Sequence, residues 1–443
     1  MTEPDVSDLL TVAQAIEVID GVEVAPRVVE VALAEADGLV LAEDIVADRD
    51  YPPFDKSLMD GYAVRCADLT AKPQATLKVI GEIAAGAQAA RGLAPGEAFA
   101  IMTGAPMPDG ADGVVPVEDV ERSTEIVRIL RSTNPGRFIA KRGSDVRHGL
   151  VVLHRGSRLG PAQLTVAASV GAFRVNAFAK PRVAVLATGD ELVPIDSTPG
   201  PAQIRNSNSL MLVSLLKRLG CDVTDLGVVR DTPEAVREAL QNGMRFDFLF
   251  VTGGMSMGAH DYVPRTLLEL GVDLKITKLR IKPGKPFVFG IRRHEGTEAR
   301  RHQGGDEATG SGAADGSSLS THSVPSRVRA SVPSSTYVFG LPGNPVSGFV
   351  CTVRLAARLL ARMAGAAPEP RWTNRPLLSP LPVNGPREFY QPVLLSDHGV
   401  TPLEWKGSAD VYTLAAANAL LVRAENEPPR AAGDVVRVLE IPS

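Results

Sequence analysis

Residues 182–363 constrain the fold most, because short apolar runs alternate there with helical patterns. Three apolar runs, 183–186, 223–229 and 246–251, are predicted to be strands, with a helix between neighbouring runs. Strands that are apolar on both faces and joined by helices are typical of a parallel sheet with helices on both sides. This part of the chain therefore predicts a three-layer α/β domain with right-handed crossovers.

Helix-start signals accompany the apolar periodicity. A helix is predicted over residues 9–19, with Ser7 as the candidate N-cap. Another is predicted over about residues 207–219, with Asn206 or Ser207 as its N-cap. Both caps can satisfy backbone N–H groups that the first helical turn leaves without partners.

Length and composition narrow the class of protein. The 443 residues predict about three or four domains at roughly 150 residues each. A formal charge of −4 gives no basic footprint for nucleic acid, and no run of 18 or more apolar residues predicts a membrane span. The three cysteines are too far apart for a disulfide framework or zinc ribbon, and no basic signal-peptide start is present. We therefore expect a cytoplasmic protein that binds neither nucleic acid nor membranes.

Other segments are punctuated differently. Residues 51–145 contain short alternating runs, such as 75–80 and 126–130, that are interrupted by Gly and Pro and favour a β-rich module. Residues 292–335 are rich in Gly, Ser, Ala and charge, which predicts a disordered insertion. Short strands near the end, such as 434–440, predict a small β-domain.

Polar loops that contain glycine follow the first and third predicted strands, at residues 187–191 and 252–258. In open α/β sheets, ligands bind outside the carboxyl ends of the strands. Glycines at such places let backbone N–H groups approach a phosphate. A tight packing turn is the alternative for either loop alone. Two such loops at neighbouring strand ends predict an anion site.

Acidic residues gather at the same predicted edge, namely Asp190, Glu191, Asp231 and Asp261. Magnesium usually takes one or two protein carboxylates together with substrate phosphates, and this edge offers both. Asp231 can equally have a structural role, because either Asp231 or Thr232 can be the N-cap of the helix that follows. The pattern predicts a magnesium and phosphate site.

A Pro-Gly turn fixes the spacing of Lys282 and Lys285. Two ammonium groups on a stiff turn can receive a doubly charged oxyanion, although solvated surface lysines are the common alternative. A second stiff turn, 341–347, leads into a predicted helix and presents Ser347. The histidines show no metal spacing, and neither a Gly-x-Ser-x-Gly elbow nor a Walker A loop is present, so nucleophilic catalysis is disfavoured.

The ordered motifs taken together are more specific than any one of them. They are Pro53-Phe-Asp-Lys-Ser-Leu-Met-Asp-Gly-Tyr-Ala-Val64, Ile101-Met-Thr-Gly-Ala-Pro106, Arg142-Gly-Ser-Asp145, Thr188-Gly-Asp-Glu191, Thr252-Gly-Gly-Met-Ser-Met-Gly258 with Asp261-Tyr262, Lys282-Pro-Gly-Lys-Pro286 and Leu341-Pro-Gly-Asn-Pro-Val-Ser347. Over nearly the whole chain this set resembles the molybdopterin molybdenumtransferases, that is, MoeA and the E domain of gephyrin.

The resemblance implies a multidomain α/β fold in an elongated homodimer. The domains that it implies are a discontinuous helical and extended N-terminal domain (1–50 and 146–180), a β-rich lasso domain (51–145), a three-layer α/β domain with a mostly parallel sheet (181–365, including the insertion 292–335) and a small β-barrel-like C-terminal domain (366–443). The active site would then lie between subunits.

The resemblance also implies roles for particular residues. Those that would reach the sheet edge of the partner subunit are Asp60, Thr103 and Asp145. Those that would hold the cofactor Mg²⁺ and the pyrophosphate are Glu191, Asp231 and Asp261. Those that would bind the pterin and its phosphates are Thr188, Gly189, Asp190, Gly253, Gly254 and Ser256. Those that would bind molybdate are Lys282, Lys285, Ser347, Arg387 and Ser408.

The implied reaction is molybdenum insertion into adenylyl-molybdopterin, with release of AMP and formation of the molybdenum cofactor. Further expected partners are the molybdopterin adenylyltransferase and the chaperones of particular molybdoenzymes. Two alternatives stay open. Adenylyltransferases share a Gly-Gly-x-Ser loop followed by Asp, but they are single-domain proteins. A non-catalytic scaffold is the other alternative, as gephyrin's anchoring role illustrates.

Overall fold

The computed structural model of the chain describes residues 9–70, 74–255, 261–294, 333–368 and 370–442. The chain divides into two units: unit 1 comprises Met1–Arg27 with Phe178–Ser443, and unit 2 comprises Val28–Ala177. The predicted disorder of 292–335 falls mostly on residues 295–332, which lie outside the described residues, as does Ser256. None of the helices in the described ranges has the length and apolar character that crossing a bilayer requires.

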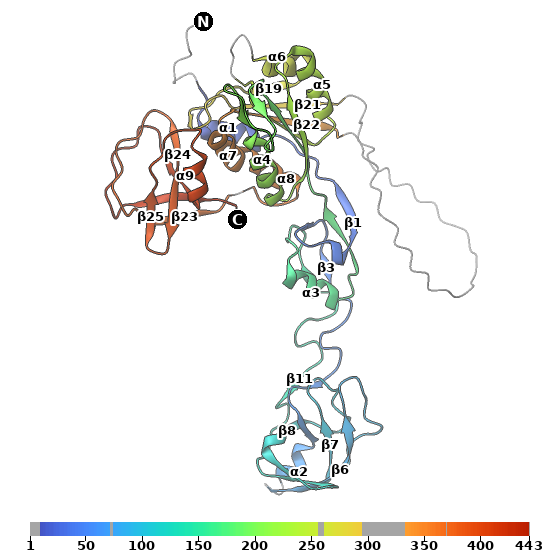
Figure 1. Ribbon diagram of the computed structural model, residues 1–443. Coiled ribbons are helices and arrows are strands. Elements are labelled where there is room, and N and C mark those ends of the chain that lie inside the picture. The colour runs from blue at the N-terminus through green and yellow to red at the C-terminus, as the bar shows by residue number, and fades with distance from the viewer. Residues whose placement is uncertain (1–8, 71–73, 256–260, 295–332, 369, 443) are drawn as a thin grey trace, which may run out of the picture. The chain divides into compact units, whose positions relative to one another are not determined.

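The central sheet of unit 1 has the strand order β17-β14-β18-β22-β21-β19 (Figure 1). Its strands are β14 (Arg182–Thr188), β17 (Asp222–Val229), β18 (Phe248–Thr252), β19 (Asp273–Ile276), β21 (Val288–Arg293) and β22 (Ser335–Leu341). The neighbours β17, β14, β18 and β22 are parallel, whereas β21 and β19 pair antiparallel. The three predicted strands are β14, β17 and β18, and the prediction of a mostly parallel sheet is confirmed.

Helices cover both faces of this sheet (Figure 1). They are α1 (Val12–Asp20), α4 (Ser207–Arg218), α5 (Pro233–Gly243), α6 (Tyr262–Glu269), α7 (Pro345–Cys351) and α8 (Ala357–Met363), with a π-helical turn Thr352–Ala356 between the last two. One face presents Phe250 and Phe339 to α1, α4, α7 and α8, while the other presents Leu249 and Val338 to α5 and α6. Because successive strand residues point to opposite faces, a continuous apolar strand fills both layers.

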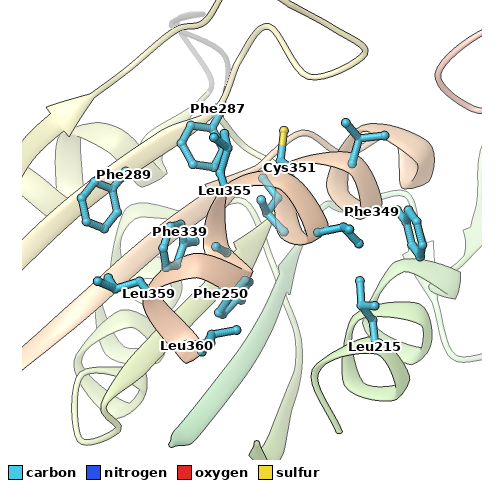
Figure 2. Close-up of a cluster of buried hydrophobic side chains, with 14 of the residues drawn as sticks. Leu215, Phe250, Phe287, Phe289, Phe339, Phe349, Cys351, Leu355, Leu359 and Leu360 are labelled. Carbon is cyan, nitrogen blue, oxygen red and sulfur yellow. The ribbon is translucent and has the colours of Figure 1, made fainter. Parts of the chain in front are cut away.

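The larger core is built around aromatic side chains of the sheet (Figure 2). Phe339 is fully buried, and its ring centroid lies 5.1 Å from that of Phe250, 5.0 Å from Phe289 and 6.1 Å from Phe287. Aliphatic side chains such as Leu355 close this cluster from the helical side. This core therefore holds the segment from α7 to α8 against one face of the sheet.

The structure shows which residues cap the N-terminal ends of α1 and α4. Thr11, not Ser7, caps α1: its hydroxyl accepts from the backbone N–H of Gln14 at 3.1 Å. The side chain of Gln14 accepts in return from the backbone N–H of Thr11 at 2.9 Å, so this reciprocal pair sets the start of the helix. Asn206, rather than Ser207, caps α4.

The C-terminal part of unit 1 is a second sheet with the order β20-β24-β26-β27-β23, with β25 beside β24. Its elements are β20 (Ile281–Lys282), β23 (Trp372–Pro376), β24 (Glu388–Ser396), β25 (Gly399–Pro402), α9 (Val411–Ala416), β26 (Ala419–Arg423) and β27 (Val435–Glu440). Strand β20 comes from the α/β part of the chain and pairs in parallel with β24, which sets Lys282 opposite Phe389. Between β14 and α4, the short strands β15 (Leu192–Val193) and β16 (Ile204–Arg205) also pair.

Unit 2 is rich in short strands. Its sheets have the orders β8-β5-β7-β6-β10-β9, β1-β13-β2, β11-β4 and β12-β3. The elements are β1 (Val28–Ala32), the 3-10 turn Leu33–Glu35, β2 (Val40–Leu41), β3 (Ile45–Val46), β4 (Lys56–Ser57), β5 (Gly61–Val64), α2 (Cys66–Thr70), β6 (Thr76–Ile83), β7 (Glu97–Ile101), β8 (Gly113–Pro116), the 3-10 turn Val117–Asp119, β9 (Val120–Arg122), β10 (Ile126–Ile129), β11 (Ile139–Ala140), β12 (Val151–Leu153), α3 (Pro161–Ser169) and β13 (Arg174–Phe178). One core joins residues 36–47 to 159–175, and two others lie within 62–139. The division of the chain into four domains stays a prediction.

Candidate functional site

Three carboxylates approach one another where β14 and β17 end. Asp190 and Glu191 follow β14, and Asp231 follows β17. The backbone N–H of Asp231 donates to Oδ1 of Asp190 at 3.3 Å. Thr232 caps α5 through its side chain, so Asp231 is not the N-cap that the sequence left open. The Asp231 carboxylate is therefore not committed to the helix start.

The electrostatics of this edge favour a bound cation. Burial raises the pKa of Asp231, and the negative charges of Asp190 and Glu191 raise it further. The Thr188 hydroxyl lies beside Asp231 and opposes this rise, but it is buried without a well-formed hydrogen bond to any described residue. The repulsion between neighbouring carboxylates is reduced when a positive ion binds or when one of them takes up a proton. The edge thus offers hard oxygen donors to a divalent cation.

The donor set fits Mg²⁺ only if substrate oxygens complete it. Within the described ranges, no group of three or more His, Cys, Asp or Glu side chains is arranged to hold a metal ion. Asp261 stands at the start of α6, where its carboxylate makes no capping hydrogen bond, and the structure does not gather it with Glu191 and Asp231 into one cluster. Magnesium ordinarily needs one or two protein carboxylates when phosphates supply the remaining ligands. Glu191, which follows β14, and Asp231, which follows β17, meet that requirement.

Glycines after β14 and β18 allow two loops to approach closely. Gly253 has φ +91° and Gly254 has φ +60°, in the left-handed region that favours glycine. A Cβ on Gly253 would lie 2.2 Å from the carbonyl oxygen of Thr188, and one on Gly254 would lie 2.8 Å from its hydroxyl. A Cβ on Gly189 would similarly lie 2.7 Å from the Glu191 carboxylate. Larger residues are therefore excluded at these three positions, and the two loops pack closely against each other.

A pocket of about 490 Å³ unites all five residues that the resemblance assigns to molybdate. They are Lys282, Lys285, Ser347, Arg387 and Ser408. Lys406 adds a fourth cationic side chain, and no Asp or Glu from the described part of the chain lines the pocket. We call this site the oxyanion pocket, because four cations without a lining carboxylate favour an anion of more than one charge.

The walls of the oxyanion pocket are fixed by contacts between distant segments. The side-chain amide of Asn344 donates to the Ser408 hydroxyl at 2.8 Å, and the backbone N–H of Val346 donates to the Ser408 carbonyl at 3.1 Å. Between the two lysines, Gly284 has φ +124°, and a Cβ there would lie 2.6 Å from Sγ of Cys351. The lysine turn therefore packs directly on α7.

Asn208 connects the oxyanion pocket to the glycine loop after β18. Its side-chain amide donates to the carbonyl oxygen of Gly343 at 2.6 Å and to the Thr252 hydroxyl at 3.2 Å. The backbone N–H of Gly253 donates to the carbonyl oxygen of Leu341 at 3.3 Å. The oxyanion pocket and the glycine loop are therefore neighbours at the carboxyl edge of the sheet.

Sequence reasoning gave no role to three polar or aromatic side chains that line the oxyanion pocket, those of Asn344, Trp405 and Lys406. Asn344 stands inside the motif 341–347, so its motif position was a usable signal. Trp405 and Lys406 precede Ser408 in a loop whose local sequence carries no such signal. They enter the pocket because β24 pairs with β20, which is a long-range contact.

In unit 2, Asp60 and Thr103 are in direct contact. Oδ1 of Asp60 accepts from the backbone N–H of Thr103 at 2.7 Å and from its hydroxyl at 2.9 Å, and these bonds lower the pKa of Asp60. Asp145 accepts from the Ser144 hydroxyl at 3.1 Å, and its backbone N–H donates to the carbonyl oxygen of Tyr51 at 2.9 Å. That these three residues serve the sheet edge of a partner subunit stays a prediction.

Three family models match the chain in order. They describe the MoeA N-terminal region (domains I and II) over residues 10–171, a probable molybdopterin binding domain over 184–362 and the MoeA C-terminal region (domain IV) over 374–441. The chain belongs to the MoeA family. This confirms the resemblance drawn from the ordered motifs.

Curated relatives and solved structures agree with this membership. The molybdopterin molybdenumtransferase of Nostoc sp. is 31% identical over 420 residues, which cover 92% of this chain and 87% of the relative. That of Haemophilus influenzae is 32% identical over 349 residues, which cover 78% of this chain and 75% of the relative. The crystal structure of the MoeA protein of Pyrococcus horikoshii matches 98% of this chain and 100% of its own, with a TM-score of 0.76 and 26% identity. The multidomain α/β fold is therefore that of the MoeA family.

Proposed function

We propose that this MoeA-family chain inserts molybdenum from molybdate into adenylyl-molybdopterin, releasing AMP and forming the molybdenum cofactor. The oxyanion pocket is the observation that carries this proposal, because its cations and hydroxyls suit a tetrahedral dianion. Its position beside the glycine loop suits transfer between two bound substrates. The printed names of the Nostoc and Haemophilus relatives agree with this transfer activity.

The activated pterin is proposed to lie along the carboxyl edge of the sheet. The loop of Gly253 and Gly254 would face its pyrophosphate, because it follows the carboxyl end of β18. A hollow of about 670 Å³ adjoins Gly189 and Asp190, and its walls mix apolar side chains such as Val213 with polar ones such as Gln203, which suits a fused heteroaromatic ring with polar edges. Glu191 and Asp231 would hold Mg²⁺, with Asp261 as the third carboxylate that the resemblance assigns to it, and the bound ion would polarise the phosphoanhydride.

In this proposal the chain's own residues place and neutralise the reactants. Lys282 and Lys285 hold molybdate by charge, while the hydroxyls of Ser347 and Ser408 orient its oxygens. Water attacks the phosphoanhydride, which releases AMP and leaves a phosphate on the pterin. The two dithiolene sulfurs replace two oxygens of molybdate, which are protonated and leave as water, so molybdenum stays Mo(VI) and no reductant is needed. No side chain is required as a nucleophile, so no covalent enzyme intermediate forms.

The assembly and location of the chain are also proposals. We place it in the cytoplasm as a homodimer, with Asp60, Thr103 and Asp145 of one subunit serving the other's sheet edge. The molybdopterin adenylyltransferase and molybdoenzyme chaperones are the proposed partners that deliver the substrate and receive the product. The direct contact between Asp60 and Thr103 supports a prearranged pair in unit 2.

The activity is tested with the purified full-length chain, adenylyl-molybdopterin, molybdate and MgCl₂. AMP release is expected to require molybdate and to stop when EDTA removes Mg²⁺. Release at the same rate without molybdate would contradict the proposed transfer. An inert chain would favour the scaffold alternative, and formation of adenylyl-molybdopterin from ATP would favour the adenylyltransferase alternative.

Lys282→Ala is expected to raise the KM for molybdate by about tenfold to a hundredfold, because a hydrogen bond to a charged group is lost. Lys217→Ala is the matched control, since Lys217 is exposed at the end of α4 and does not line the oxyanion pocket. Initial rates of AMP release across a molybdate titration measure both variants. An unchanged KM for Lys282→Ala would remove this residue from the molybdate site.

A further inference from the structure

Two aromatic rings lie beside Lys282, one of the lysines of the oxyanion pocket. Its ammonium nitrogen lies 4.5 Å from the ring centroid of Phe389 and 5.6 Å from that of Trp405. The two rings lie 5.2 Å apart, tilted by 36°. Both separations fall within the range in which a cation is attracted to the face of an aromatic ring.

The described residues give Lys282 no carboxylate partner. Partial burial lowers its pKa, and the positive charges of Arg387 and Arg423 lower it further. An ammonium in such a place is ordinarily kept charged by an ion pair with Asp or Glu. A carboxylate here would occupy N–H donors of the lysine and repel an incoming anion. Aromatic rings stabilise the cation without either effect, because they carry no net charge and contact it through their π-electrons.

The rings reach Lys282 through the packing of two distant segments. Phe389 is its partner in the β20–β24 pairing and is 8% exposed, so that contact is fixed by the backbone ladder. Trp405 lies in the loop before α9 and lines the oxyanion pocket beside Lys406. The indole N–H of Trp405 is buried without an acceptor among the described residues, so this side chain contributes its ring and not a hydrogen bond to the contact with Lys282.

We propose that Phe389 and Trp405 form an aromatic seat that positions the Lys282 ammonium and takes the place of a carboxylate counter-ion. The seat holds the nitrogen at the pocket and leaves its positive charge and N–H groups to the substrate oxyanion. Phe389 and Trp405 are thus positioning residues that determine the affinity for molybdate, not groups that react. This inference rests on the proposed function of the pocket.

Trp405→Leu tests the seat, with molybdate binding to the full-length chain measured by isothermal titration calorimetry. The Kd for molybdate is expected to rise by about tenfold, which corresponds to about 1.4 kcal/mol. Trp405→Phe restores a ring and is expected to stay within about threefold of the wild type. In the AMP-release assay, Trp405→Leu is expected to raise the KM for molybdate and to change kcat by less than about twofold.

Trp405→Glu and Trp405→Gln separate charge from packing, because the two side chains have nearly the same size. The Glu variant is expected to bind molybdate at least about tenfold more weakly than the Gln variant, since its carboxylate would pair with Lys282. Equal affinities for these two variants would overturn the proposal even if both are less stable than the wild type. So would wild-type affinity in Trp405→Leu.

Trp372→Leu is the matched control for loss of an indole. Trp372 lies in β23, in the same sheet as Phe389, and does not line the oxyanion pocket. Its ring centroid lies 3.8 Å from the guanidinium carbon of Arg437 and 5.2 Å from that of Arg354. Its substitution is expected to leave the Kd for molybdate unchanged; an equal loss in both variants would indicate a structural effect and overturn the seat. If the wild type binds no molybdate, the proposed function of the pocket fails together with the seat. If the wild type binds molybdate and Trp405→Leu binds it equally well, the seat alone fails.

Discussion

Asp261→Asn is expected to lower molybdate-dependent AMP release by about a hundredfold or more, while the fold and the oligomeric state stay unchanged. The proposed role of Asp261 is to supply negative charge near Mg²⁺ and the pyrophosphate, and an amide removes that charge with little change in shape. The side chain makes no capping hydrogen bond at the start of α6, and Asn is as good an N-cap residue as Asp. A loss of activity would therefore report the site, not the helix.

The matched control is Asp222→Asn. Asp222 is the first residue of β17, whereas Asp231 follows the other end of this strand, and Asp222 is exposed. It carries the same chemical change away from the carboxyl edge, and we expect AMP release to stay at the wild-type rate. The assay is AMP formation with and without molybdate, and size-exclusion chromatography follows the assembly. Near-normal release by Asp261→Asn would remove Asp261 from the proposed carboxylate site.

Phe339→Ala is expected to destabilise unit 1 by about 3–5 kcal/mol. The ring is fully buried in β22 and packs against Phe250 and Phe289 at centroid distances of 5.1 Å and 5.0 Å (Figure 2). Its removal leaves a cavity that the neighbouring aromatic rings cannot fill without leaving their own contacts. The same core supports α7, so the oxyanion pocket should be lost in the same transition.

Unfolding in guanidinium chloride, followed by the fluorescence of Trp372 and Trp405 in unit 1, measures this loss. Phe339→Leu keeps most of the apolar volume and is expected to cost less than Phe339→Ala. Tyr412→Ala removes an aromatic ring of unit 1 that is 85% exposed, and we expect a change within about 0.5 kcal/mol. A transition of Phe339→Ala that coincides with the wild type would contradict the central place of this ring.

Much of the α/β part was predictable because its signals are local. Continuous apolar runs predicted β14, β17 and β18, and the glycines of two loops marked the crevice at their ends. The helix caps were predicted in part: Thr11 replaces Ser7 at the first helix, whereas Thr232, one of the two residues that the sequence left open, caps α5. Several polar residues near a helix start can act as caps, and the backbone path decides which one does.

The oxyanion pocket was predictable in part. Lys282, Lys285 and Ser347 stand in stiff turns that the sequence displays, whereas Arg387 and Ser408 came from the resemblance alone. Nothing in the local sequence shows that β20 leaves the α/β part of the chain to pair with β24. Such a contact depends on loop closure over about a hundred residues, which sequence periodicity does not record.

The sequence by itself determined the parallel sheet, the glycine loops and the ordered motifs of the MoeA family, because each depends on residues that are close together in the chain. Only the tertiary structure decided which side chains meet. It separated Asp231 from the cap of α5, joined the two loops through Asn208 and set two aromatic rings beside Lys282. The physical reason is that hydrophobic patterns fix which face of an element is buried, while register and packing between distant elements fix which polar groups converge.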